Sequence, residues 1–277
     1  MPDPVFAHPR LAALYDVFDH PRPDLVPYVA LADELGGHHV LDVGCGTGVL
    51  AALLVAAGYE VTGADPALAS LDVARARPGT AAVTWLPVEA AQLPALGCDL
   101  AVMTGNVAQV FVTDEDWDAA LRGLARAVRP GGHLVFETRR PEAEDWRTWS
   151  GPPQVRTVPG EGTVRTEFEL LAATPPLVTF RTVFTFADGE RLTSESTLRF
   201  RGPAELRSSL LRHGFTVAEV REAPDRPGLE HVVLASRSPS GGGAQAPPAA
   251  SVTVSGANAA PLTSTPAEVS SSRACWT

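Results

Sequence analysis

The stretch from residue 40 to residue 48 constrains the fold more than any other part of this sequence. It reads Val-Leu-Asp-Val-Gly-Cys-Gly-Thr-Gly, so glycine occupies positions 44, 46 and 48. The apolar start predicts a buried strand, and the periodic segment 49–57 predicts the beginning of a helix. Glycine in the turn lets the backbone adopt positive φ and lets a ligand lie against it. The stretch therefore predicts a strand, a tight turn and a helix whose first N–H groups face a ligand.

Alternating strand and helix patterns continue to residue 237 and predict an α/β protein. Six further strands are predicted at 59–64, 83–86, 99–104, 133–136, 215–220 and 231–235. The other predicted helices are 11–18, 25–35, 67–77, 117–128 and 203–213. With the strand before the glycine loop, the sequence predicts seven strands in one main sheet.

The pattern changes between residues 151 and 201. Alternating apolar and polar residues at 164–170, 178–186 and 191–198 predict strands of an antiparallel insertion after the fifth strand. Such sheets have one face for packing and one for solvent or a partner. The insertion is interpreted either as a cover over the ligand edge or as a surface for homodimer contact.

An acidic residue, Asp65, ends the second predicted strand, 23 positions after Asp42. Nucleotide-binding folds place a carboxylate near this offset, where it accepts hydrogen bonds from ribose hydroxyls. Asp65 and Pro66 also fit a helix N-cap followed by proline at the first helical position. Both roles stay open for Asp65.

The stretch Asp42-Val43-Gly44-Cys45-Gly46-Thr47-Gly48 resembles the first motif of the class I, Rossmann-like methyltransferases that use S-adenosylmethionine. The resemblance runs from about Leu11 to Arg237 and implies one methyltransferase domain over residues 1–237. It implies a three-layer fold around a seven-stranded sheet whose last strand is antiparallel. It also implies S-adenosyl-L-methionine as cofactor, with the glycine loop around its methionine part.

The resemblance also implies which residues contact the adenine and which residue covers the cofactor. Glu89 and Ala90 resemble the family's acidic-plus-small pair that meets the adenine, and a tyrosine of an N-terminal helix, here Tyr15, closes over the cofactor. Tyr15 and Tyr28 are equally well interpreted as anchors that pack on the sheet. The predicted cofactor-binding residues are Tyr15, Asp42, Gly44, Cys45, Gly46, Gly48, Asp65, Pro66, Glu89, Ala90, Gly105 and Asn106.

Ligands of open α/β sheets bind beyond the carboxyl ends of the strands. The fourth and fifth predicted strands end there with polar residues, which predicts a substrate site formed by Gln109, Glu137 and Arg139. Trp146 and Trp149 follow as possible walls of that site.

Methyl transfer needs alignment of the reacting atoms more than it needs a base. The candidates for a catalytic residue are Glu137 and Tyr15, with His8 and His20 behind Glu137. The sequence favours another role for Glu137, that of a rim carboxylate that pairs with Arg139.

These features predict a methyltransferase that acts on nitrogen or oxygen of a small metabolite. A nicotinamide-dependent oxidoreductase is the alternative, but its glycine pattern would need glycine or alanine where Val49 stands, and the chain contains no lysine for a Tyr-x-x-x-Lys site. A protein that binds the cofactor without turnover also stays open.

Composition limits the partners. A net charge of −10 and a pI near 5.2 argue against nucleic acid, which requires a basic face. The histidines show no metal-ligand spacing, and three cysteines cannot form a disulfide framework. No leader or membrane-spanning run is found, so a cytoplasmic protein is expected. The Ser-, Gly-, Ala- and Pro-rich segment 238–277 predicts a disordered tail.

Overall fold

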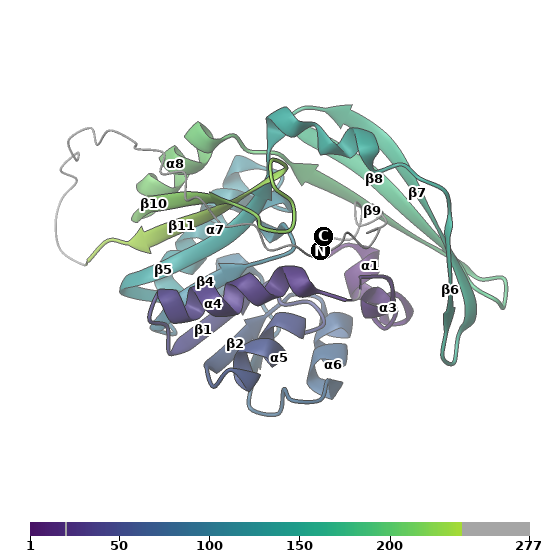
Figure 1. Cartoon of the computed structure of the whole chain (residues 1–277), viewed down its shortest axis with the longest axis horizontal. Helices are drawn as coiled ribbons and strands as arrows, with labels where there is room; N and C mark the ends of the chain where they lie inside the picture. Colours follow the sequence, from purple (N-terminus) through teal and green to yellow (C-terminus); the bar gives the residue numbers. More distant parts are fainter. Residues whose placement is uncertain (20, 240–277) are drawn as a thin grey trace, which may run out of the picture.

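The computed structural model of this protein describes residues 1–19 and 21–239. It contains a seven-stranded sheet and a separate four-stranded antiparallel sheet. Figure 1 shows the smaller sheet arching beside the larger one, with the N-terminal helices at the lower end of the space between them. The predicted tail from residue 240 onward and His20 lie outside the described residues.

The seven-stranded sheet has the order β10-β11-β5-β4-β1-β2-β3. Its strands are β1 His39–Val43, β2 Glu60–Ala64, β3 Thr84–Leu86, β4 Cys98–Met103, β5 Val128–Arg139, β10 Phe215–Glu222 and β11 Glu230–Arg237. The ladders between β1, β2, β3, β4 and β5 are parallel, and β11 runs antiparallel to both β5 and β10. The predicted seven strands and the antiparallel last strand are therefore confirmed. The strand predicted at 133–136 is longer, because its pairing with β11 continues to Arg139.

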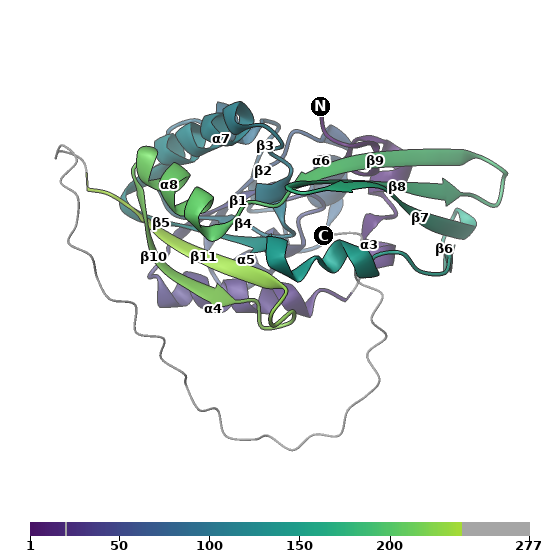
Figure 2. The ribbon, with the colours of Figure 1, turned by 90° about the horizontal axis from the view of Figure 1, so that it is seen from above.

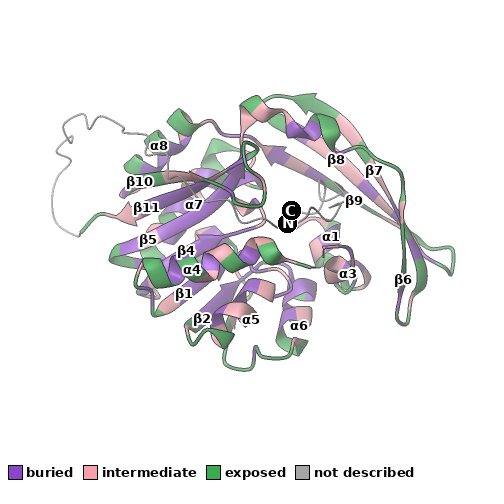
Figure 3. Ribbon diagram, viewed as in Figure 1, coloured by how far each residue is buried: buried purple, intermediate pink, exposed green. Residues whose placement is uncertain are grey.

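Helices cover both faces of this sheet and complete the predicted three layers (Figure 2). They are α4 Val26–Glu34, α5 Val49–Ala56, α6 Leu68–Ala76, α7 Asp114–Ala127 and α8 Pro203–Arg212. One apolar cluster joins α7 and α8 to Leu134 and Phe136 of β5, and a second joins α4 and α5 to Val135. Successive residues of β5 thus point to opposite layers, as a strand buried on both faces requires. Figure 3 shows the central strands as the most continuously buried part of the chain.

The chain before α4 is more broken than predicted. The segment 11–18 divides between two short helices, and the N-terminal helices are α1 Pro4–Ala7, α2 Pro9–Ala12 and α3 Tyr15–Asp19. Leu11, Leu14 and Phe18 are all buried in one cluster with residues of the antiparallel sheet. Packing against that second sheet, rather than a continuous helix on the main sheet, determines the path of this segment.

The insertion forms four strands, β6 Gln154–Val158, β7 Gly162–Thr174, β8 Leu177–Thr185 and β9 Arg191–Arg199. Three of them were predicted, whereas β6, a short edge strand, was not. The outer face carries a charged ladder in which Arg181 pairs with Glu169 and Glu195. The inner face packs on the N-terminal helices through Val164 and Phe184. This arrangement favours the interpretation of the insertion as a cover. Its use as a surface for homodimer contact stays a prediction.

Short 3-10 helices η1 Pro23–Leu25, η2 Ala90–Gln92, η3 Val107–Gln109, η4 Pro141–Ala143 and η5 Asp145–Thr148 connect these elements. Over residues 1–19 and 21–239, every helix is too short or too polar to cross a bilayer.

Candidate active site

The three glycines of the loop between β1 and α5 all have positive φ, +70° at Gly44, +52° at Gly46 and +76° at Gly48. A Cβ at Gly44 would lie 2.5 Å from Val107, and one at Gly48 would lie 2.8 Å from the Trp85 ring. A Cβ at Gly46 would meet nothing within 4 Å. The outer two glycines therefore allow close packing of the chain on itself, and only the middle one faces open space that a ligand could fill.

Asp65 is bound to the glycine loop. Its Oδ2 accepts the Gly46 N–H at 2.9 Å, and its Oδ1 accepts the Ala67 N–H at 2.7 Å. The bond to its own chain two residues on forms a local turn, and α6 begins only at Leu68. The N-cap predicted for Asp65, with Pro66 at the first helical position, is therefore wrong. An ionised carboxylate offers about four acceptor positions, so two stay available for ligand hydroxyls.

Asp42 lies at the carboxyl end of β1, beside the glycine loop, with a relative exposure of 1%. Its Oδ2 makes no hydrogen bond to the described residues. Burial, and then repulsion by Asp65, raises the pKa of Asp42 to about 7. A buried carboxylate oxygen without a donor is unfavourable by itself, and it suits a ligand that brings a donor or a positive charge.

The segment around α3 is hydrogen-bonded to the glycine loop between β1 and α5. Asp16 accepts a hydrogen bond from the Thr47 hydroxyl at 2.6 Å and pairs with Arg77. Arg77 also donates to the Thr47 carbonyl oxygen at 2.8 Å. Tyr15 packs on Phe6 with ring centroids 5.5 Å apart, and burial raises its pKa. The sequence suggested Tyr15 at this place, but it gave no sign of the contact between Asp16 and Thr47.

Three other predicted cofactor residues lie in the loop itself or after β3. Cys45 is buried, and its N–H donates to the Ala64 carbonyl oxygen at 3.2 Å. Glu89 and Ala90 follow β3, with Glu89 exposed and Ala90 buried at the start of η2. The contact of Glu89 and Ala90 with an adenine stays a prediction.

Glu137 of β5 joins three segments at the rim. Its Oε1 accepts the N–H groups of Gly105 and, at 3.2 Å, of Asn106, and its Oε2 accepts the Tyr28 hydroxyl of α4. Gly105 and Asn106 are both left-handed, with φ of +65° and +58°. Glu137 therefore fixes the turn after β4. Burial and repulsion by Glu230 raise its pKa to about 7 against these hydrogen bonds.

The alternative role given to Glu137, a pair with Arg139, is wrong. Arg139 is 1% exposed and lies 3.4 Å from Asp145 and 3.7 Å from Glu230. It also donates to the Gln109 Oε1 at 3.2 Å. Glu137 and Arg139, two positions apart on β5, thus have different partners.

This places the predicted substrate residues Gln109 and Arg139 against one another in a buried network, behind the rim. The predicted walls Trp146 and Trp149 are also buried, in an apolar cluster with Phe200. Direct contact of these residues with a substrate stays a prediction. His8, a candidate base, joins α1 to α2, which contact α6, and no hydrogen bond links it to Glu137.

Sequence reasoning missed the other half of the network. Arg226, in the loop between β10 and β11, pairs with Asp145 at 3.0 Å and with Glu230 at 2.8 Å. The Asn106 amide nitrogen donates to the same Glu230 oxygen at 3.2 Å. No local sequence signal could have found this group, because only the pairing of β5 with β11 brings its members together.

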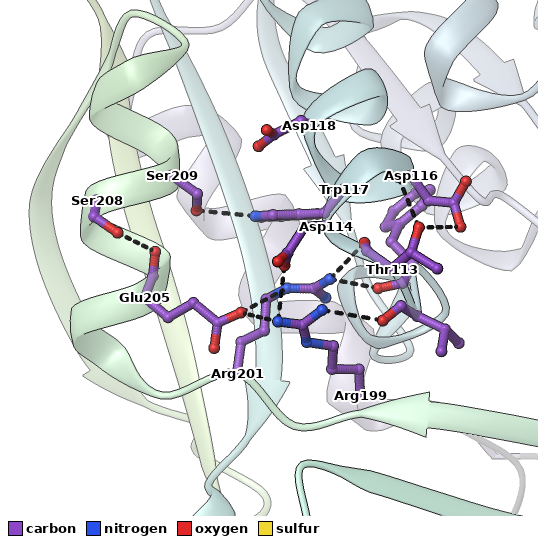
Figure 4. Close-up of polar contacts among 12 residues, drawn as sticks. Thr113, Asp114, Asp116, Trp117, Asp118, Arg199, Arg201, Glu205, Ser208 and Ser209 are labelled. Carbon is purple, nitrogen blue, oxygen red and sulfur yellow. Dashed lines mark hydrogen bonds and ion pairs between the residues drawn. The ribbon is translucent and has the colours of Figure 1, made fainter.

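Two arginines at the end of β9 tie the antiparallel sheet to the rim loop (Figure 4). Arg201 donates to the carbonyl oxygens of Phe111 at 2.5 Å and Thr113 at 3.1 Å. Arg199 donates to the Val112 carbonyl oxygen at 3.2 Å and pairs with Glu205. The loop after β4 is thus held by Glu137 at its start and by Arg199 and Arg201 at its end. Among the described residues, no cluster of three metal-ligating side chains occurs.

Comparisons with known proteins bear on this site. Residues 40–132 match a family model described as a methyltransferase domain. The ubiquinone/menaquinone biosynthesis C-methyltransferase UbiE of Rubrivivax gelatinosus is 36% identical over 108 residues, which are 39% of this chain and 42% of that protein. The ubiquinone biosynthesis O-methyltransferase of Proteus mirabilis is 34% identical over 42% of this chain and 47% of that protein. The chain thus spans less than half the length of these relatives.

Solved structures show the same fold over most of the chain. The CcbJ methyltransferase of Streptomyces caelestis superposes with a TM-score of 0.65 at 20% identity, over 81% of this chain and 96% of that one. DesVI of Streptomyces venezuelae gives 0.67 at 20% identity, over 83% and 98%. The sugar N-methyltransferase KedS8 of a Streptoalloteichus species gives 0.66 at 19% identity, over 81% and 92%. At these identities the likeness concerns the fold alone.

Proposed function

We propose that this chain, which belongs to the class I, S-adenosylmethionine-dependent methyltransferases, transfers a methyl group to nitrogen or oxygen of a small metabolite. The family match covers the glycine loop, Asp65 and the loop after β4. The single observation that carries the proposal is the open space at Gly46, whose N–H is held by the Asp65 carboxylate, in a loop that follows Asp42 with its unpartnered Oδ2.

These residues fit S-adenosylmethionine by their chemistry. The cofactor supplies an electrophilic methyl group on a positively charged sulfur. Gly46 leaves room for it, Asp65 has acceptor positions left for hydroxyls, and the ionised form of Asp42 favours a cationic ligand. The candidate residues toward the adenine are Glu89 and Ala90.

The chain's own contribution to the reaction is orientation and exclusion of water. Orientation of reacting groups can lower a barrier by about 7 to 11 kcal/mol. The turn at Gly105 and Asn106 is held by Glu137, and the loop after it by Arg201, so this edge is rigid. The N-terminal helices and the antiparallel sheet supply a cover. Glu137 is the candidate base, because its pKa near 7 suits proton transfer at neutral pH.

The acceptor is the least determined part of the proposal. The curated relatives are named as C- and O-methyltransferases, and a structural neighbour is named as a sugar N-methyltransferase. We propose a small-molecule acceptor and a cytoplasmic enzyme, consistent with the net charge of −10. Assembly as a homodimer stays a prediction.

Calorimetry with S-adenosylmethionine, S-adenosylhomocysteine and a nicotinamide dinucleotide tests the cofactor. We expect heat of binding with the first two compounds only. Binding of the dinucleotide alone would favour the oxidoreductase. Incubation with methyl-labelled cofactor and a bacterial metabolite extract then separates an enzyme from a protein that binds the cofactor without turnover, because only the enzyme labels a metabolite.

A further inference from the structure

A small cavity of about 20 Å³ lies beside the rim, between the segment after α3, the end of β5 and the loop before β11. About 10 to 15 Å³ is enough for one water-sized group. Five carboxylates and two guanidinium groups line the cavity, which gives a formal charge of −3. It has room for the charged head group of a ligand and not for a ring.

Both guanidinium groups are already neutralised. Arg22 pairs with Asp19 at 2.7 Å and with Asp24 at 2.8 Å. Arg226 pairs in the same way with two carboxylates, Glu230 and Asp145. Neither arginine is therefore available to attract an anion into the cavity.

The remaining carboxylates at the cavity are in excess. No ion pair among the described residues includes Glu137 or Asp225, which both line it. Glu137 is 7% exposed, so its charge is not relieved by solvent. Its Oε2 accepts only the Tyr28 hydroxyl, which leaves that oxygen one acceptor position.

An unpartnered amide oxygen belongs to a neighbour of the cavity, Asn106, which is bonded to Glu137 and Glu230 without lining the cavity itself. Asn106 is 2% exposed, and its side-chain nitrogen donates to Glu230, so the amide reaches the cavity wall. Its Oδ1 has no hydrogen-bond partner among the described residues. A buried acceptor without a donor is unfavourable, and the described residues give no donor to the Asn106 Oδ1 or to the second acceptor position of the Glu137 Oε2.

We propose that the methyl acceptor is an amine and that this cavity binds its ammonium group through the carboxylates of Glu137 and Glu230, which both line it. The inference rests on the proposed methyl transfer and narrows the accepting atom to nitrogen. An ammonium group brings a positive charge and up to three donors, whereas a hydroxyl brings no charge and one donor. The cavity lacks an unpaired positive charge and free hydrogen-bond donors, and an ammonium group would supply both.

An ammonium nitrogen has no lone pair and must lose a proton before it reacts. The Glu137 Oε2 accepts that proton, and the freed nitrogen lone pair forms the new bond to the methyl carbon. The bond between that carbon and sulfur breaks, and its electron pair stays on sulfur as a neutral thioether. Glu137 then passes its proton to water, which restores the carboxylate and balances the reaction.

Titration of the protein saturated with S-adenosylhomocysteine tests the site directly. The probes are matched pairs, namely cyclohexylamine with cyclohexanol, benzylamine with benzyl alcohol, and glucosamine with glucose. We expect at least one amine to bind ten-fold or more tightly than its alcohol. Equal binding within every pair, or no amine binding to protein that holds S-adenosylhomocysteine, overturns the proposal.

Three variants test which residues produce the preference for an amine over its matched alcohol. Glu230→Gln should reduce it by ten-fold or more, and Asp225→Asn, at an exposed position that leaves the fold intact, by about two- to three-fold. Glu222→Gln, an exposed carboxylate of the same hairpin outside the cavity, is the matched control and should change nothing. Retained preference in both Glu230→Gln and Asp225→Asn contradicts the assignment.

Cofactor affinity distinguishes this inference from the proposed function. We expect S-adenosylhomocysteine to bind all three variants within two-fold of the parent protein. If Glu230→Gln weakens the cofactor and leaves the amine preference, the cavity serves the cofactor and the inference is wrong while methyl transfer stands. If the parent protein binds neither form of the cofactor, the proposed function fails as well.

Discussion

The cofactor region and the acceptor region differ in how the chain builds them. The cofactor region takes its main groups from residues 42–67, which are continuous in sequence and bonded mostly to one another. The acceptor region joins Tyr28, Asn106, Glu137 and Glu230, which are far apart in the chain and meet only at the carboxyl edge of the sheet. The first region depends on backbone conformation and the second on buried charge, so mutations should affect them differently.

The largest effect is expected in the acceptor region, on stability. Arg139→Met should lower the free energy of unfolding by about 3 to 5 kcal/mol, because it removes one of the two guanidinium groups that neutralise the buried carboxylates of Asp145 and Glu230. Arg140→Met, next in sequence, removes a surface pair with Glu222 and should cost about 1 kcal/mol or less. Denaturant unfolding at pH 7 measures both. Equal losses would mean that burial of the Arg139 network contributes nothing.

In the cofactor region the largest effect should appear in ligand binding. Gly46→Val forces a branched side chain into φ +52° and into the open space, so we expect cofactor affinity to fall by more than about 3 kcal/mol. Gly97→Val is the matched control, because Gly97 has φ +68°, equally open surroundings and no place in the site. Both variants should lose similar stability. Calorimetry showing unchanged cofactor affinity in Gly46→Val would contradict this assignment of the loop.

Asp65→Ala should weaken the cofactor by about 1.5 to 3 kcal/mol, the scale of a hydrogen bond to a charged group. The fold should stand, with a modest loss of stability because two N–H groups lose their acceptor. Asp99→Ala is the control, since Asp99 also accepts two backbone N–H groups, from His38 and His39, at the other end of the strands. If both variants bind the cofactor like the parent, Asp65 only orders the loop.

The last comparison concerns pH and uses one carboxyl group from each region. Asp42 and Glu137 both have a pKa raised to about 7 by burial, above their values in an unfolded chain. The folded protein then binds more protons than the unfolded one, so their contribution is present below about pH 4 and is lost as pH rises toward 7. Asp42→Asn and Glu137→Gln should therefore gain stability relative to the parent between pH 4 and 8. A difference from the parent that does not change with pH would contradict the raised pKa values.

The sequence by itself predicted the seven-stranded sheet, its antiparallel last strand, the insertion and the glycine loop. The strands, the insertion and the glycine loop follow from apolar periodicity and from glycine at three alternate positions, which are local properties of the chain. The antiparallel last strand was implied by the family resemblance. The same information left the role of Asp65 open, and the structure removes the N-cap alternative. It failed at the first helix, which packing on a second sheet divides.

Only the tertiary structure decided the partners of the charged residues. Glu137 and Arg139 are two positions apart on one strand and were expected to pair, but Glu137 binds the turn after β4 while Arg139 binds Asp145 and Glu230. Most of these partners are distant in sequence and are brought to β5 by the neighbouring strands β4 and β11, and the charges interact strongly only because burial removes water. The glycine loop, Asp65 and Glu137 were therefore visible in the sequence, whereas Arg226, Glu230 and the arrangement that gives these residues their chemistry arise from strand order and burial.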